Sequence, residues 1–236
     1  MKFKFVALLI FLSLSSSLQA LEYRSYSFQK LSSKLGYPSD NFFGSSEDEL
    51  FDLNTYTDKS DAYYQEINGF LRFYPAPYEW YGTGPDKARE MVVNIDKIFG
   101  RVPSLPADLV FFRGLTLSYR KNKSYEVGEE ISDKGYVSTS TNIEVAKHFA
   151  VGMNADHPEK KKAIMVMYLS SKDQKGILID QEEDEIILKH GQLMKIMAVD
   201  KSDKLPYETY LVQVCKAICE SSMNKDIAKF WQSHKY

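Results

Sequence analysis

The sequence has little of what marks several common classes of protein. Its 30 basic and 32 acidic residues nearly cancel, for a net charge of −2, so it lacks the basic excess of a general nucleic-acid binder. It contains two cysteines and four histidines, and the scattered histidines offer no cluster of metal ligands. We therefore expect neither nucleic acid as a partner nor a bound metal.

Long hydrophobic runs are also lacking, except near the start of the chain. The apolar run at 5–14 follows Lys2 and Lys4 and leads through small and polar residues to Ala20. A basic start, a short apolar run and a small final residue are typical of a secretory signal peptide, and the run is too short to span a bilayer comfortably. We expect removal of residues 1–20, which changes the net charge to −4. The mature protein should be secreted, without stable insertion in a membrane.

The two cysteines, Cys215 and Cys219, lie four residues apart. An exported protein can oxidise such a pair, and a helical spacing would bring the two sulfurs close together. An extended strand would hold them too far apart. The sequence therefore leaves two interpretations of the pair open, a disulfide that closes a short loop and two buried thiols.

Local patterns change in kind along the chain. Residues 21–45 are polar with scattered aromatics and no clean period, and we interpret them as an N-terminal extension. The apolar spacing predicts helices at 46–53, 62–73, 87–99, 145–150 and 224–231, and strands at 109–112, 129–131, 135–140, 163–169, 183–188, 194–199 and 207–214. The stretches 152–162 and 170–182 are predicted to be loops. Helices first and short strands after them indicate an α+β catalytic domain over 46–236.

The stretch from Gln181 to Leu188 is unusual because four acidic residues are followed at once by three aliphatic ones. The aliphatic run favours a buried strand, whereas carboxylates resist burial unless they are paired or used. If 183–188 is one strand, Glu183 and Glu185 share a face, roughly 6.6 Å apart along the chain. The alternative is a charged loop that runs into a core strand.

Two other polar groups lie at the ends of predicted strands. Arg113 and Gly114 follow the apolar run at 109–112, and Ser138-Thr139-Ser140 ends the run at 135–140. Each has an ordinary structural explanation, as a paired arginine or as a cluster that caps a helix. The order of the three groups along the chain makes them informative together.

In that order the groups resemble the motifs of the mono-ADP-ribosyltransferases that carry an arginine, a serine–threonine–serine and a glutamate-x-glutamate motif. This class includes cholera-like and clostridial binary toxins and vertebrate ecto-transferases. The matching segments are Phe112-Arg113-Gly114-Leu115, Gly135-Tyr136-Val137-Ser138-Thr139-Ser140 and Glu183-Asp184-Glu185-Ile186-Ile187-Leu188, with about 25 and 47 residues between the key positions.

Upstream pairs extend the resemblance to residues 46–200. Tyr56-Thr57, Ile67-Asn68 and Leu71-Arg72 resemble the helical region before the family's arginine. The resemblance implies the family's fold, in which N-terminal helices precede two packed, mostly antiparallel sheets around a cleft for NAD. It also implies NAD as the co-substrate.

The resemblance assigns the chemistry to three residues. Glu185 would hold the ribose and stabilise the positive charge that develops on it as the bond to nicotinamide breaks. Ser138 would hydrogen-bond Glu185 and fix its rotamer. Arg113 would present its fork of donors to the diphosphate and ribose side of NAD.

Four further residues are implied at the cofactor. Gly114 would let the backbone approach the nicotinamide amide, and Phe149 would stack on the nicotinamide ring. Thr139 and Ser140 would support the end of the strand and its loop. Lysines 160–162 could face the phosphates of NAD, with a solvated charged loop as the alternative.

Glu183 carries the prediction of the acceptor. In the family, glutamate at this position goes with arginine acceptors, and glutamine with asparagine, glutamine or related acceptors. A shifted register would place Gln181 there and make Glu183 catalytic, but the aliphatic run begins directly after Glu185, as in the family. We therefore expect transfer of ADP-ribose to an arginine of a target protein, by a toxin or effector. The loop 170–182, expected to contact the acceptor, lacks the aromatic residue that relatives often present, which leaves the target open.

Three alternatives remain. The same fold with water as acceptor gives an NAD glycohydrolase. An inactive relative that only binds a partner should have lost Arg113, Ser138 or Glu185, and all three are present. A glycoside hydrolase needs two carboxylates that flank a bond, which fits two glutamates on one strand face poorly.

Overall fold

The computed structural model describes residues 23–38, 42–58, 63–75, 84–179 and 183–233. The predicted signal peptide, Gln181 and Glu182 lie outside the described residues. The helices are α1 (Phe28–Leu35), η1 (Phe42–Gly44), α2 (Glu47–Thr57), α3 (Tyr63–Phe73), α4 (Gly84–Arg101), η2 (Ser118–Arg120), α5 (Ile143–Lys147), η3 (His148–Gly152) and α6 (Lys225–Ser233). The strands are β1 (Val110–Thr116), β2 (Glu130–Asp133), β3 (Val137–Ser140), β4 (Lys162–Leu169), β5 (Gly176–Leu178), β6 (Glu185–Leu188), β7 (Gln192–Asp200) and β8 (Glu208–Cys215).

The strands are hydrogen-bonded in the order β2-β7-β8-β4-β1-β3-β6-β5. All neighbours are antiparallel except β4 and β8, which run parallel. The predicted α+β class and the order of helices before strands are confirmed. The two expected sheets are joined into one, because β1 pairs with β3 at a single position, Phe112 opposite Ser140. Five strands therefore lie on one side of this junction and three on the other.

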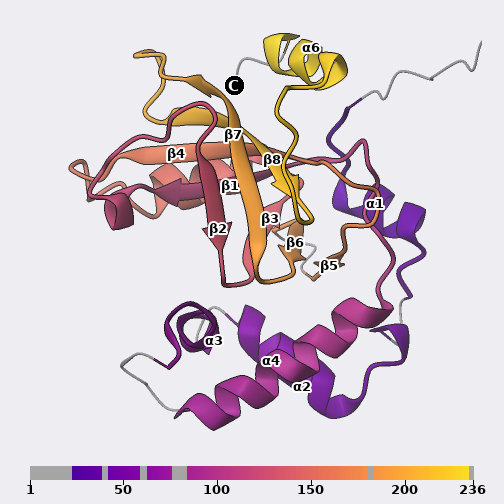
Figure 1. Cartoon of the computed structure of the whole chain (residues 1–236). Coiled ribbons are helices and arrows are strands. Elements are labelled where there is room, and N and C mark those ends of the chain that lie inside the picture. The colour runs from indigo at the N-terminus through magenta and orange to yellow at the C-terminus, as the bar shows by residue number, and fades with distance from the viewer. Residues whose placement is uncertain (1–22, 39–41, 59–62, 76–83, 180–182, 234–236) are drawn as a thin grey trace, which may run out of the picture.

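Helices α2, α3 and α4 gather on one side of the sheet, and α6 lies at the opposite end of the molecule (Figure 1). The three helices bury Leu53, Ile67 and Ile95 in one cluster with Ile177 of β5 and Ile187 of β6. This cluster fastens the helical layer to the three-stranded side of the sheet. The same side carries the glutamate motif.

Strand β6 is buried on both of its faces, which explains its unbroken aliphatic run. Ile187 packs among the helices α2–α4, whereas Ile186 and Leu188 point into the central core. The exposed fraction of each of the three side chains is at most 1%. A strand covered on both sides needs apolar residues at successive positions instead of alternate ones. The run thus anchors Glu185, the first residue of the strand.

Two helix starts follow the sequence pattern. Ser46 and Glu49 form a capping box at α2: the Glu49 backbone N–H donates to the Ser46 hydroxyl, and the Ser46 N–H donates to the Glu49 carboxylate. At the start of α5, the Asn142 side chain accepts from the Glu144 N–H. Helix α4 runs to Arg101, two residues beyond the predicted end at 99.

Helix α1 and strand β5 were missed by the sequence patterns. Helix α1 lies in the stretch 21–45, where no period was visible, and buries Leu31 completely in the central core. Strand β5 lies inside the predicted loop 170–182 and pairs with β6. Both are short. Strand β5 depends on its pairing with β6, whereas α1 also carries local signals, because Ser27 caps its start and the left-handed Gly36 ends it.

Cys215, the last residue of β8, forms a disulfide with Cys219. The Cα atoms of the two cysteines lie 5.2 Å apart. Among the helices in the described ranges, none is long and apolar enough to cross a membrane.

Candidate active site

A cavity of about 560 Å³ lies where the junction of the sheet meets helices α2, α3 and α5. Its wall includes all eight residues that the sequence nominated: Arg113, Gly114, Ser138, Thr139, Ser140, Phe149, Glu183 and Glu185. The helical side contributes Tyr56, Thr57, Asp58 and Tyr64. Residues from three separate motifs thus come together around one space.

Arg113 lies in the middle of β1, not at its end as the apolar run suggested. The strand continues to Thr116 and pairs with β4 along its whole length, with Arg113 opposite Met165. The Arg113 side chain is 24% exposed, and its Nη1 lies 3.4 Å from Oδ2 of Asp133 at the end of β2. A half-buried guanidinium is thereby held at the cavity wall by a carboxylate.

Gly114 is required by packing against the helix that crosses β1. A Cβ at this position would lie 1.7 Å from the backbone oxygen of Ala146 in α5 and 2.9 Å from the backbone nitrogen of Ala150. No side chain fits in that space. The glycine therefore allows a close approach of α5 to β1, a reason for its presence that the sequence did not reveal.

Ser138 and Glu185 meet across the antiparallel pair β3–β6. Ser138 stands opposite Ile187, so Glu185, two residues earlier on β6, is its diagonal neighbour on the same face. The Ser138 hydroxyl donates to Oε1 of Glu185 at 2.5 Å. This face is the one covered by α2–α4, because Ile187 packs among those helices. The glutamate is thus oriented from a rigid strand by a neighbouring hydroxyl.

Glu183 is not part of the strand, which corrects the expectation of one strand over 183–188. Strand β6 begins at Glu185, and Asp184 has a φ of 49°. A left-handed residue ends the extended conformation, so the two glutamates do not share a face of one strand. The Ser140 hydroxyl donates to the backbone oxygen of Glu183 at 2.7 Å, and the Thr141 N–H donates to that of Asp184 at 3.0 Å. The turn nevertheless places Glu183 at the cavity wall.

The remaining nominated residues have distinct surroundings. The buried Thr139 hydroxyl donates to the backbone oxygen of Ile186 at 2.7 Å and ties β3 to β6. Phe149 lies half-buried in η3, a π-helical segment, at the cavity wall. Lys161 pairs with Glu208 at 3.0 Å. Among the residues described around the cavity, none of lysines 160–162 forms its wall, so of the two alternatives the contact with the phosphates gains no support.

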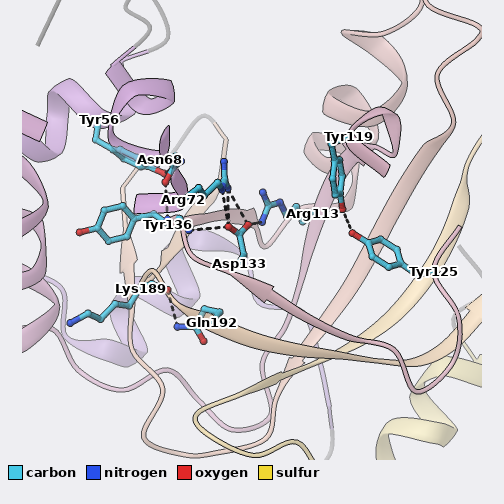
Figure 2. A network of polar contacts seen from close by, with 11 residues as sticks. Tyr56, Asn68, Arg72, Arg113, Tyr119, Tyr125, Asp133, Tyr136, Lys189 and Gln192 are labelled. Atoms are coloured by element: carbon cyan, nitrogen blue, oxygen red, sulfur yellow. Dashed lines mark hydrogen bonds and ion pairs between the residues drawn. The ribbon is translucent and has the colours of Figure 1, made fainter. Parts of the chain in front are cut away.

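The sequence did not predict a polar network that lies beside the cavity (Figure 2). The Asn68 amide of α3 donates to the Tyr56 hydroxyl at 3.1 Å and accepts from the Tyr136 N–H at 2.8 Å. Burial raises the pKa of Tyr56, and the charge of nearby Glu185 raises it further against the opposing effect of Asn68. Tyr56 therefore stays protonated as a hydrogen-bonding group at the wall.

Asp133 joins this network to Arg113. Its carboxylate accepts from Nε and Nη2 of Arg72 at 3.0 and 3.1 Å, and from the Gly135 N–H at 3.0 Å. In the sequence, Arg72 and Asn68 stood out only through the resemblance. The sole sign of Asp133 was the turn-forming order Asp-Lys-Gly.

The family model for the ADP-ribosyltransferase exoenzymes matches residues 20–218 of the chain. This chain belongs to that family. Among curated protein sequences, none matches it. The match places the three motifs and the cavity within one ADP-ribosyltransferase domain, and it begins well before residue 46.

Solved structures of ADP-ribosyltransferases share the fold at low sequence identity. The Vis toxin of Vibrio splendidus has a TM-score of 0.60 and 18% identity, over 85% of this chain and 91% of that one. C3stau2 of S. aureus, solved with NAD, has a TM-score of 0.57 and 16% identity, over 82% and 98% of the two chains. Vis has also been solved with agmatine, at 19% identity over 83% and 88% of the chains and a TM-score of 0.60. At these identities the likeness shows the fold alone.

Proposed function

We propose that this exoenzyme-family member is a secreted NAD–protein-arginine ADP-ribosyltransferase that acts as a toxin or effector. The observation that carries the proposal is the hydrogen bond from Ser138 to Glu185, made inside a cavity that Arg113 and Glu183 also line. Residues 1–20 supply the export signal in this proposal.

The wall of the cavity suits NAD as substrate. Its volume, about 560 Å³, lies in the range of small-molecule sites. Arg113 and Arg72 share the single carboxylate of Asp133, which leaves one net positive charge for the diphosphate. Phe149 supplies a ring for the nicotinamide. The close packing at Gly114 fixes the position of α5 relative to β1 and so the shape of the site.

In the first step the bond between C1 of the ribose and the nicotinamide nitrogen breaks. Its electron pair leaves with nicotinamide, which departs as a neutral molecule, and positive charge grows on the sugar. The carboxylate of Glu185 stabilises this charge, which exists mainly in the transition state. Ser138 keeps the carboxylate aimed, so little reorganisation is needed as the reaction proceeds.

In the second step a guanidinium nitrogen of the acceptor attacks C1 and loses a proton. Because free arginine has a pKa above about 12, the acceptor needs a group that orients it and takes the proton. Glu183 at the cavity wall is the residue that we assign to this role. Agmatine, which carries the guanidinium of arginine, is bound by the structural relative Vis, and that supports a guanidinium acceptor here.

An NAD glycohydrolase of the same fold is the second candidate. It would use Glu185 and Arg113 in the same way, with water in place of the guanidinium. The position of Glu183 in a turn at the cavity wall favours transfer, because hydrolysis needs no group to orient a bulky cation.

One experiment separates the candidates. The mature protein is incubated with labelled NAD and a host-cell lysate, and the labelled protein and residue are identified by mass spectrometry. In parallel, nicotinamide release is measured with and without agmatine. We expect label on arginine and faster release with agmatine. Release that no guanidino compound or protein accelerates would instead establish a glycohydrolase.

A further inference from the structure

We propose that Asp133 is a positioning residue for NAD binding, which clamps Arg113 at the cavity wall and fastens helix α3 to the strand that carries Ser138. The inference rests on the proposed function in one respect, the contact between Arg113 and NAD.

The geometry of Asp133 is that of a shared clamp. Figure 2 shows the side chains of Arg72 and Arg113 converging on its carboxylate from two directions. Arg72 makes a two-pronged contact through Nε and Nη2, at 3.0 and 3.1 Å. Arg113 contacts the same carboxylate through Nη1 at 3.4 Å. A guanidinium has five N–H donors, so a contact through Nη1 fixes the direction of the fork without using it up.

The charges explain why the clamp has three members. Two guanidinium groups this close would repel each other, and a lone carboxylate beside a diphosphate site would repel the substrate. With Asp133 between them, the arginines share one negative charge and keep one positive charge in excess. The Asp133 and Arg113 side chains are only 15% and 24% exposed, so water screens these interactions less than it does at the surface.

Gly135 leaves room for the clamp. A Cβ at this position would lie 2.7 Å from Oδ1 of Asn68 and 2.9 Å from Nη2 of Arg72. Two residues of α3 therefore occupy space near the connection between β2 and β3 that a side chain at position 135 would enter. That connection continues into β3, where Ser138 holds Glu185. The clamp thus links the phosphate-binding arginine, the helical layer and the catalytic strand.

The test uses Asp133→Asn, which keeps the shape of the side chain and removes its charge. Equilibrium binding of NAD is measured by calorimetry, and nicotinamide release gives KM and kcat. We expect Kd and KM for NAD to rise about tenfold, the equivalent of one charge-assisted hydrogen bond, while kcat changes little. The matched control is Asp108→Asn, because Asp108 also binds two cations, Arg24 and Lys34, but lies outside the cavity wall. The control should leave Kd for NAD unchanged.

A double-mutant cycle locates the effect. In an Arg113→Ala background, Asp133→Asn should raise Kd for NAD far less than it does in the wild-type background. An undiminished effect, or an unchanged Kd in folded Asp133→Asn protein, would overturn the clamp. If Arg113→Ala alone left Kd unchanged, the assigned role of Arg113 in the proposed function would fail instead. Because calorimetry needs no turnover, the clamp is tested even if no acceptor is known.

Gly135→Ala tests the same clamp if Asp133→Asn does not fold. Its added methyl group displaces Oδ1 of Asn68 and the end of Arg72 without changing any charge. We expect Kd for NAD to rise about threefold, in line with one weakened hydrogen bond, and thermal unfolding to show a folded protein. An unchanged Kd in this variant would contradict the inference.

Discussion

The two glutamates at the cavity wall lie two residues apart but are held in different ways. Glu185 is the first residue of β6, and its side chain accepts directly from the Ser138 hydroxyl. Glu183 lies in the turn before the strand, where the Ser140 hydroxyl donates to its backbone oxygen. The serine motif therefore fixes a carboxylate at one position and a stretch of backbone at the other. This difference suits a fixed catalytic group beside an acceptor-binding group on a turn.

The largest effect is expected from Glu185→Gln, which removes the charge and keeps the shape. Without the carboxylate the positive charge on the ribose is not stabilised, so nicotinamide release should fall about 10³-fold, with and without agmatine. Thermal unfolding should match wild type, and Glu90→Gln on the exposed face of α4 serves as the control. A folded variant that keeps most of its release rate would refute the role of Glu185.

Glu183→Gln should affect transfer and spare hydrolysis, unlike Glu185→Gln. Loss of a group that orients the guanidinium and accepts its proton should lower transfer to agmatine about 100-fold, while hydrolysis of NAD by water stays within about threefold of wild type. Both products are measured by chromatography in the same reaction. If hydrolysis fell as far as transfer, the two glutamates would share one task and our division between them would be wrong.

Ser138→Ala tests how Glu185 is held at the start of β6. It removes the hydroxyl that orients Glu185, so transfer and hydrolysis should fall together, about tenfold, as expected for one hydrogen bond to a charged group. Rates of nicotinamide release with and without agmatine give both numbers. A drop in transfer alone would show that Ser138 serves the acceptor.

Ser140→Ala tests how the turn that contains Glu183 is held, and it should have the smallest effect. Its hydroxyl holds the backbone oxygen of Glu183 and also accepts from the Asn142 N–H. Loss of these bonds loosens the turn, so transfer to agmatine should fall about threefold, with hydrolysis unchanged. The informative quantity is the ratio of the rate of transfer to the rate of hydrolysis. An equal fall of both rates would show that Ser140 supports Glu185 and not the turn at Glu183.

The sequence was a good guide to the site because its motifs are local. Strong apolar runs predicted β4, β7 and β8 nearly to the residue, and the three ordered motifs indicated which of their neighbours would line the cavity. The turn at Asp184 was missed because alternation predicts a strand wherever extended conformation is possible. A φ of 49° at Asp184 has no clear sign in a run of acids.

What the sequence missed depends on contacts between distant segments. Strand β5 has three residues and exists because it pairs with β6. The clamp joins Asp133 to Arg72 and Arg113, which lie 61 and 20 positions before it in the sequence. The packing of α5 on Gly114 is another such contact. Each needs the folded chain to bring its members together.

The position of Glu183 outside β6 has a consequence for how this enzyme family can diversify. A residue inserted or deleted within β6 would put Glu185 on the other face from Ile187, and so turn it away from Ser138. The turn before β6 is free of that constraint, because a change of length there is absorbed by the loop. Under the proposed function, new target proteins can thus be acquired by changes in the segment up to Asp184, while the Ser138–Glu185 pair is inherited unchanged.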